Sequence, residues 1–207
     1  MRELKIKNIT WISLIKPSQD DLEELVKRFP NIHPLVREDI ASQTIRSHVG
    51  NYGSHLYMVL HFPRFLEHEH RTIANEIDFI LLKDVLITAH YDTIPLLENF
   101  WHDCESGSSE IQERYGKTPV HLVHYLMRRI FAQSLRELDA IQEKIDIMEE
   151  EVFSGKEKEI LEDIALLKRN VLDFRRVSKP QLLTLESFVA EGAELFGRET
   201  RPLLTAL

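Results

Sequence analysis

Alternating hydrophobic and polar positions in the first 118 residues predict several strands. Leu4, Ile6, Ile9 and Trp11 alternate with polar residues, which is typical of half-buried strands. Runs rich in β-branched and aromatic residues predict further strands at 56–62, 72–82 and 85–90. Turn residues at 51–53 and 83–84 separate these runs, and a charged turn is predicted at 67–71.

Helical spacing predicts three helices in the same part of the chain. Ser18 and Asp21 form a capping-box pattern at the start of the first helix. Its apolar residues, Leu22, Leu25, Val26 and Phe29, lie on one helical stripe. Pro34 suits a first helical position, so a second helix is predicted at 35–43. A third helix is predicted at 93–103. The polar segment 105–117, with two glycines, is predicted to be a loop.

The remainder of the chain has helical periodicity almost throughout. From Pro119 to Phe153, apolar residues recur at intervals close to a heptad, at positions 131, 135, 138, 141, 145, 148 and 152. A break at 154–155 and a second amphipathic helix from about Glu157 predict an antiparallel hairpin, with a kink or restart at Pro180. The predicted fold class is therefore α/β (α+β): a mixed sheet flanked by helices in a domain 1–118, followed by a long helical hairpin and the start of a stalk helix in 119–207.

Composition removes several classes of function. The chain has 207 residues and a net charge of −8, which suits nucleic acid poorly, so no nucleic-acid partner is predicted. A single cysteine, Cys104, excludes an internal disulfide, and no apolar run approaches the length of a membrane span. The glycine spacings of nucleotide-binding loops and of the G-x-S-x-G nucleophile turn are absent. We therefore predict no enzyme, no catalytic residue and no organic cofactor.

The candidate metal ligands among the histidines and acids each have an ordinary structural alternative. His68 and His70 share a face if they lie on a strand, but an exposed hairpin tip is the simpler interpretation. His121 and His124 share a helical face and are interpreted as packing or surface residues. Residues 149–151, three consecutive glutamates, are interpreted as a solvated charge run. Acidic neighbours of Cys104 disfavour its thiolate, because they raise a thiol pKa.

Glu38 and Asp39 are the most informative acids. Asp39 follows Leu35 by four residues and Val36 by three, which places its carboxylate on or beside the apolar stripe of the predicted helix. A carboxylate there needs a partner to offset its loss of hydration. The alternatives are a salt bridge to an arginine such as Arg46, a capping bond, or a cation. Oxygen ligands favour a hard ion, and one or two carboxylates suit hydrated Mg²⁺.

Several motifs in one order resemble the amino-terminal domain of the CorA-type magnesium transporters. They are Trp11 with Pro17, the segment 33–40 (HPLVREDI), Tyr52 and the strands after it, the segment 146–152 (DIMEEEV), the segment 167–170 (LKRN), Arg175-Arg176 and Pro180. The resemblance covers nearly the entire chain, and the order and spacing of these motifs make it specific.

The resemblance implies a regulatory domain on the cytoplasmic side of the cell (inner) membrane, detached here from the transmembrane helices that follow it in relatives. It implies a homopentamer in the full-length protein, and intracellular Mg²⁺, or Co²⁺, Ni²⁺ or Zn²⁺ in its place, bound between subunits. The aspartate of the E-D-I segment is a ligand in relatives, which assigns metal binding to Asp39 with Glu38 beside it.

Two features depart from the family pattern. Arg128 stands where some relatives have an aspartate, and residues 203–207 contain no acid at the position of the partner ligand on the stalk. From another class, the alternative is a soluble scaffold that oligomerises through its helical hairpin. A metal-dependent hydrolase using His68 and His70 is a third hypothesis, for which the sequence offers no converging acid.

Overall fold

A six-stranded mixed sheet forms the centre of the protein, as described by a computed structural model for residues 1–153 and 161–206. The strands lie in the order β1-β2-β6-β5-β4-β3, with β2 and β6 parallel and all other neighbours antiparallel. The strands are β1 (Arg2–Ile6), β2 (Ile9–Ile15), β3 (His48–Asn51), β4 (Leu56–Leu66), β5 (Arg71–Leu81) and β6 (Val85–His90). The predicted mixed sheet is confirmed, and β3 is a strand that the sequence analysis missed.

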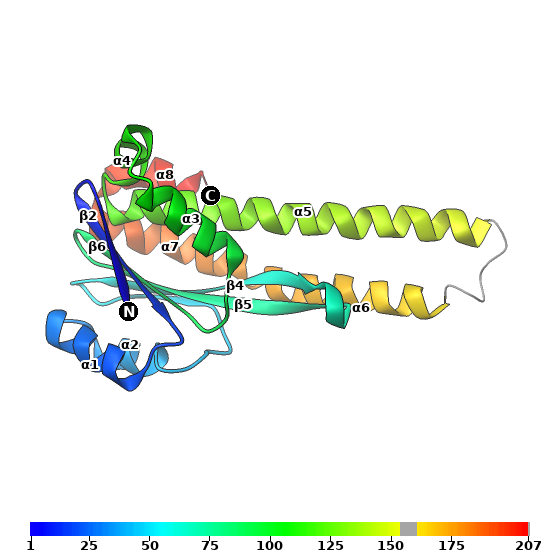
Figure 1. Ribbon diagram of the computed structural model, residues 1–207, viewed down its shortest axis with the longest axis horizontal. Helices are drawn as coiled ribbons and strands as arrows, with labels where there is room; N and C mark the ends of the chain where they lie inside the picture. Colours follow the sequence, from blue (N-terminus) through cyan, green and yellow to red (C-terminus); the bar gives the residue numbers. More distant parts are fainter. Residues whose placement is uncertain (154–160, 207) are drawn as a thin grey trace.

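The described helices cover both faces of this sheet (Figure 1). They are α1 (Gln19–Arg28), α2 (Pro34–Asp39), α3 (Pro95–Glu105), α4 (Ser109–Tyr115), α5 (Pro119–Phe153), α6 (Leu161–Ser178), α7 (Gln181–Phe196) and α8 (Arg201–Thr205), with short 3₁₀ turns at Glu67–Glu69 and Arg198–Thr200. Helices α1 and α2 pack on one face through Leu25 and Val36, and Ile40, directly after α2, belongs to the same core. Helices α3, α4, α5, α7 and α8 contribute to the core on the other face.

The core on the face covered by α3, α4, α5, α7 and α8 joins the two halves of the chain. Trp11 on β2 packs against the rings of Phe100 and Trp101 on α3, with centroids 5.6 and 4.8 Å apart. The same cluster includes Phe188 of α7 and Leu204 of α8, both fully buried. The α/β part (1–118) and the helical part (119–207) therefore share one hydrophobic core.

Helices α5 and α6 form the predicted antiparallel hairpin, which extends well beyond the sheet (Figure 1). The predicted start near Glu157 lies outside the described residues. An apolar groove between the helices is lined by Ile145, Met148, Ile164 and Val171, which confirms the distal half of the predicted seam. None of the helices within 1–153 and 161–206 combines the length and the apolar character that a bilayer span requires.

The proximal half of the seam is predicted wrongly. Leu135 and Leu138 are 61% and 45% exposed. The end of the β4–β5 hairpin lies against a different face of α5: the Phe65 backbone N–H donates to Glu137 Oε2 at 3.1 Å, and Lys144 Nζ lies 4.4 Å from the Phe65 ring centroid. The end of the β4–β5 hairpin thus lies beside α5 where the heptad pattern predicts a partner helix.

Two other local predictions are corrected by specific contacts. The predicted loop 105–117 contains α4, because Ser108 Oγ accepts the Ile111 N–H at 3.3 Å and Tyr115 is buried in the core. The helix predicted at 35–43 ends at Asp39. Its continuation is prevented because the Thr44 N–H donates to the buried Glu76 carboxylate at 2.9 Å, which fixes residues 40–44 outside a helix.

The capping box of α1 is present as predicted. The Asp21 N–H donates to Ser18 Oγ at 3.2 Å, and the Ser18 N–H donates to Asp21 Oδ2 at 2.9 Å. These bonds, with the N-terminal amine 2.8 Å from Asp21 Oδ1, lower the pKa of Asp21 to about 2. The bonds satisfy two backbone donors that would otherwise have no partner at the start of the helix.

We predict that Ser18→Ala lowers the free energy of unfolding by about 1 kcal/mol, because the first turn of α1 loses its side-chain acceptor. For a chain of this size the melting temperature should fall by about 2–4 °C. Urea denaturation followed by circular dichroism measures the effect. Ser187→Ala, at an exposed position within α7, is the matched control and should leave stability unchanged or slightly raised. Equal losses in the two variants would refute a capping role for Ser18.

Candidate functional site

The H-P-L segment forms the start of α2 and thereby sets the position of Asp39. His33 is the N-cap, and its Nδ1 accepts the Leu35 N–H at 3.3 Å, while Pro34 occupies the first turn. The His33 ring also stacks on Tyr52, with centroids 4.6 Å apart. The helix is only six residues long, so these contacts at its start also determine where Asp39, its last residue, lies.

The Asp39 carboxylate lies at the C-terminal end of α2, half-exposed on the protein surface. Its side chain is 37% exposed, and Oδ2 lies 3.6 Å from His48 Nε2 on β3. A carboxylate at this end of a helix adds to the negative end of the helix dipole. Within the described part of the chain Asp39 has no ion pair with a lysine or arginine, and the predicted salt bridge to Arg46 is not formed. The position therefore combines negative potential with access to solvent.

Glu38 does not point into the same space as Asp39. It is exposed and lines a shallow groove against α1 with Leu22, Val26 and Arg37. Successive residues on a helix differ by about 100° in direction, which separates the two carboxylates. Among the residues described, no three His, Cys, Asp or Glu side chains come together closely enough to hold a metal ion. Asp39 is therefore the accessible carboxylate at this end of α2, and it is separate from Glu38.

Two buried acids lie on β5, on the face of the sheet that α1 and α2 cover. Glu76 accepts from the Thr44 N–H at 2.9 Å and from Thr44 Oγ1 at 3.0 Å, and its Oε2 lies 3.3 Å from His61 Nε2. Asp78 Oδ2 accepts the hydroxyl of Tyr91 at 3.0 Å, and that hydroxyl also lies 3.4 Å from the Asp39 carbonyl oxygen. The buried acids are thus connected to the end of α2.

The sequence analysis missed these acids. Residues 76 and 78 alternate with Ile77 and Phe79, which is also the pattern of a strand with one face in water. Only the helices packed on that face show that both carboxylates are buried, at 4% and 1% exposure.

The charges of Glu76 and Asp39 create a region of negative potential, in which Asp78 keeps its proton at neutral pH. Burial, together with the charge of Glu76, raises the pKa of Asp78 to about 9. Burial also raises the pKa of the Tyr57 and Tyr91 hydroxyls, and the Asp39 charge acts in the same direction on both. Asp78 Oδ1 has no hydrogen-bond partner among the described residues. This environment disfavours additional negative charge.

The other sequence candidates occupy ordinary structural positions. His68 and His70 are exposed at the tip between β4 and β5, which confirms the hairpin-tip interpretation. His124 is buried in the packing of α5, and its pKa is lowered by burial. Burial raises the pKa of the Cys104 thiol to about 12, so the expected direction is confirmed, with desolvation as the main cause. Arg128 is exposed on α5, and the glutamates 149–151 lie near its end.

We predict that Asp78→Asn raises stability at alkaline pH and flattens its dependence on pH. The folded-state pKa of Asp78, about 9, exceeds its ordinary value of 3.8. Between about pH 4 and pH 9 the unfolded chain therefore releases a proton that the folded chain retains. The contribution of Asp78 to the free energy of unfolding falls as pH rises through this range. Asparagine keeps an oxygen to accept the Tyr91 hydroxyl, and we expect a gain on the order of 1 kcal/mol or more at pH 8.

Urea midpoints measured from pH 5 to pH 9 test this prediction. Asp84→Asn, at an exposed turn between β5 and β6, is the control and should keep the wild-type slope. An unchanged slope in Asp78→Asn would mean that Asp78 is already ionised in the folded protein.

Solved structures share this fold at low sequence identity. The soluble domain of CorA from Methanocaldococcus jannaschii matches with a TM-score of 0.71 at 16% identity, covering 96% of this chain and 86% of that one. The full-length CmaX protein matches with a TM-score of 0.74 at 13% identity, covering 100% of this chain and 62% of that one. The ZntB cytoplasmic domain from Vibrio parahaemolyticus matches with a TM-score of 0.70 at 12% identity, covering 98% of this chain and 80% of that one.

A curated relative extends the comparison to sequence. The cobalt/magnesium transport protein CorA from Thermotoga maritima is 25% identical over 193 residues, which are 93% of this chain and 54% of the relative. The chain therefore spans about half the length of that transporter.

The family model described as "CorA-like Mg2+ transporter protein" matches residues 7–207, which is almost the full chain. The resemblance drawn from the HPLVREDI segment and the later motifs is confirmed by this match and by the shared fold. The chain belongs to the CorA-like Mg²⁺ transporter family.

Proposed function

We propose that this chain is the cytoplasmic regulatory domain of a membrane transporter for Mg²⁺ or a similar divalent cation such as Co²⁺, Ni²⁺ or Zn²⁺. The part of the Thermotoga maritima relative that this chain does not cover is long enough to hold transmembrane helices. Membership of a transporter family supports this function over the alternative of a soluble scaffold built on the α5–α6 hairpin. In the full-length protein the domain would assemble as a homopentamer, with the α/β part (1–118) and the helical part (119–207) sharing one core.

The observation that carries the proposal is the environment of Asp39. Its carboxylate is accessible at the negative end of α2, close to the buried Glu76 and Asp78, and His48 Nε2 lies 3.6 Å from its Oδ2. Hydrated Mg²⁺ is commonly held by one or two carboxylates and several waters. Asp39 supplies one such ligand, and Glu38 on the adjoining surface adds negative charge that raises the local cation concentration.

The proposed mechanism is charge neutralisation between protomers. Asp39 surfaces on neighbouring protomers repel one another when no cation is present. A divalent cation between them replaces repulsion with attraction and favours the assembly in which these surfaces are close, which we assign to the closed state of the transporter. A fall in intracellular cation concentration releases that state.

We infer that the partner ligand in this mechanism differs from the usual one in the family. The resemblance places Arg128 where some relatives have an aspartate, and residues 203–207 contain no acid. Leu204 is instead buried in the core with α7. The cation would therefore be completed by water and by another acidic surface of the neighbouring protomer, which predicts weaker binding than a site with two aspartates.

We predict that Mg²⁺ binding to this chain, measured by isothermal titration calorimetry at high protein concentration, weakens at least fivefold in Asp39→Ala. Glu38→Gln should have a smaller effect, because that carboxylate contributes only long-range charge. Asp163→Asn, on α6 far along the chain, is the matched control and should bind as the wild type does. Equal binding by wild type and Asp39→Ala would remove Asp39 from the site, and equal weakening by Asp163→Asn would reduce the effect to net charge.

A further inference from the structure

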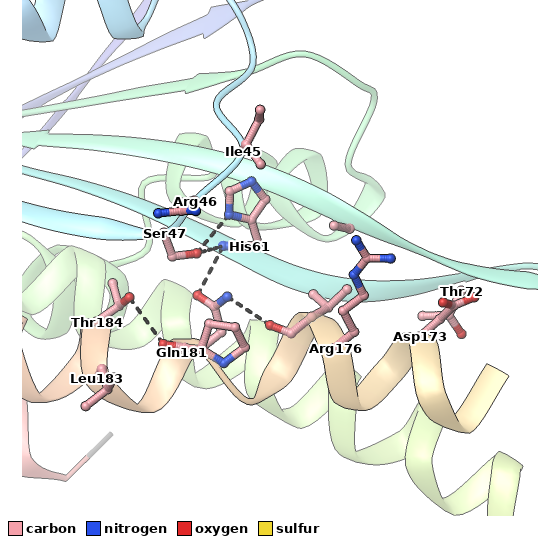
Figure 2. A pocket seen from close by; sticks show the side chains of 13 residues that line it. Ile45, Arg46, Ser47, His61, Thr72, Asp173, Arg176, Gln181, Leu183 and Thr184 are labelled. Carbon is pink, nitrogen blue, oxygen red and sulfur yellow. Dashed lines mark hydrogen bonds between the residues drawn. The ribbon is translucent and has the colours of Figure 1, made fainter. Parts of the chain in front are cut away.

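A polar cavity, separate from the Asp39 surface, lies beside the segment that joins α2 to β3. It has a volume of about 620 Å³, is open to solvent on one side, and is lined by residues 45–47, by β4 and β5, and by the junction of α6 and α7. Figure 2 shows Arg46 and Ser47 approaching it from the loop before β3 and Arg176 reaching from α6 toward the strands. Neither Asp39 nor Glu38 lines it. Its size is within the range of small-molecule sites.

The floor of the cavity is built from buried polar side chains. Ser47 Oγ and His61 Nδ1 are hydrogen-bonded at 2.8 Å, and the His61 backbone N–H donates to Gln181 Oε1 at 3.3 Å (Figure 2). His61, Gln181, Thr184 and Thr72 are each less than a tenth exposed. The Thr72 hydroxyl is buried with no hydrogen-bond partner among the described residues. An orphaned buried hydroxyl is costly, and a ligand with a polar group in this cavity would supply its partner.

Two guanidinium groups give the cavity its positive charge. Arg46 and Arg176 both line it, and neither forms an ion pair with an acid in the described part of the chain. The one carboxylate in the lining, Asp173, has its partner in Arg169 at 3.8 Å. Both arginine residues are exposed to solvent. Guanidinium groups bind phosphoryl oxygens in a planar, bidentate geometry.

Apolar side chains at the mouth indicate that the ligand is more than an inorganic ion. Ile45 is 95% exposed and Leu183 is 69% exposed, and both line the cavity. Ala74 and Val177 add to the apolar lining. A ligand with a hydrocarbon or aromatic skeleton would cover these groups and gain from their burial.

We propose that this cavity binds a small organic phosphate, with its phosphoryl group between Arg46 and Arg176 and its apolar skeleton against Ile45 and Leu183. The hydroxyl of Thr72 donates to the ligand at the cavity floor. The site is separate from Asp39 and does not depend on the proposed cation sensing.

Phenyl phosphate is a suitable probe, because it has a phosphoryl group and an apolar ring and no further functional group. We expect saturable binding by calorimetry at low ionic strength, at least tenfold tighter than binding of inorganic phosphate. Arg176→Gln should weaken it at least tenfold, whereas Arg175→Gln, the neighbouring exposed arginine outside the cavity, should stay within twofold of the wild type. Likewise, Leu183→Ser should weaken binding and Leu182→Ser, exposed but outside the lining, should not.

Each contrary result overturns the proposal. Absence of saturable binding, or equal weakening by Arg175→Gln and Arg176→Gln, would leave only non-specific charge attraction. Equal affinity for inorganic phosphate and phenyl phosphate would remove the organic skeleton from the proposal. Sedimentation with vesicles of phosphatidylcholine and phosphatidic acid, without binding of phenyl phosphate, would assign Arg46 and Arg176 to a lipid headgroup instead. Retention of Mg²⁺ binding in Arg176→Gln distinguishes failure here from failure at Asp39.

Discussion

The buried carboxylate of Glu76 determines the course of the chain from α2 to β3. It accepts two hydrogen bonds from Thr44 and lies 3.3 Å from His61 Nε2, which in turn lies 3.2 Å from the Thr44 carbonyl oxygen. His61 Nδ1 then holds Ser47 at 2.8 Å. This set of bonds ends α2 at Asp39, so that the proposed cation ligand lies before the fixed segment and Arg46 lies within it. Both candidate sites therefore depend on one polar contact inside the protein.

Burying acids beneath a small helix has an energetic cost that an apolar sheet face would avoid. A buried charge is tolerated when hydrogen bonds replace its lost hydration. Glu76 has such bonds. Asp78 accepts the Tyr91 hydroxyl, but burial and the charge of Glu76 raise its pKa to about 9. Strongly perturbed titratable groups are concentrated at functional sites. Here the buried Asp78 lies close to the residue that we assign to cation binding, since the Tyr91 hydroxyl that bonds Asp78 also lies 3.4 Å from the Asp39 carbonyl oxygen.

The sequence predicted most elements because their patterns are local. The capping box at Ser18, the helix Pro119–Phe153 and the restart after Pro180 depend on residues a few positions apart. The errors arose where distant residues decide the outcome. Glu76, 32 residues from Thr44, ends α2 early. The β4–β5 hairpin end displaces the heptad contact at Leu135. For the same reason, the position of Asp39 could be predicted, but the acids beneath it and the cavity beside Arg46 could not.

A site that is incomplete in one protomer is suited to sensing. A single carboxylate with water ligands binds Mg²⁺ weakly, because the cation gives up little of its hydration for one protein ligand. When two protomers bring acidic surfaces together, the same cation gains a second negative partner and removes the repulsion between them. A cation can favour the assembled protomers over the separated protomers only by the difference between its binding free energies to these two arrangements. In the proposed mechanism, the separation of Glu38 from Asp39 keeps the protomer from forming a tight site alone, so that cation occupancy depends on how closely the protomers approach.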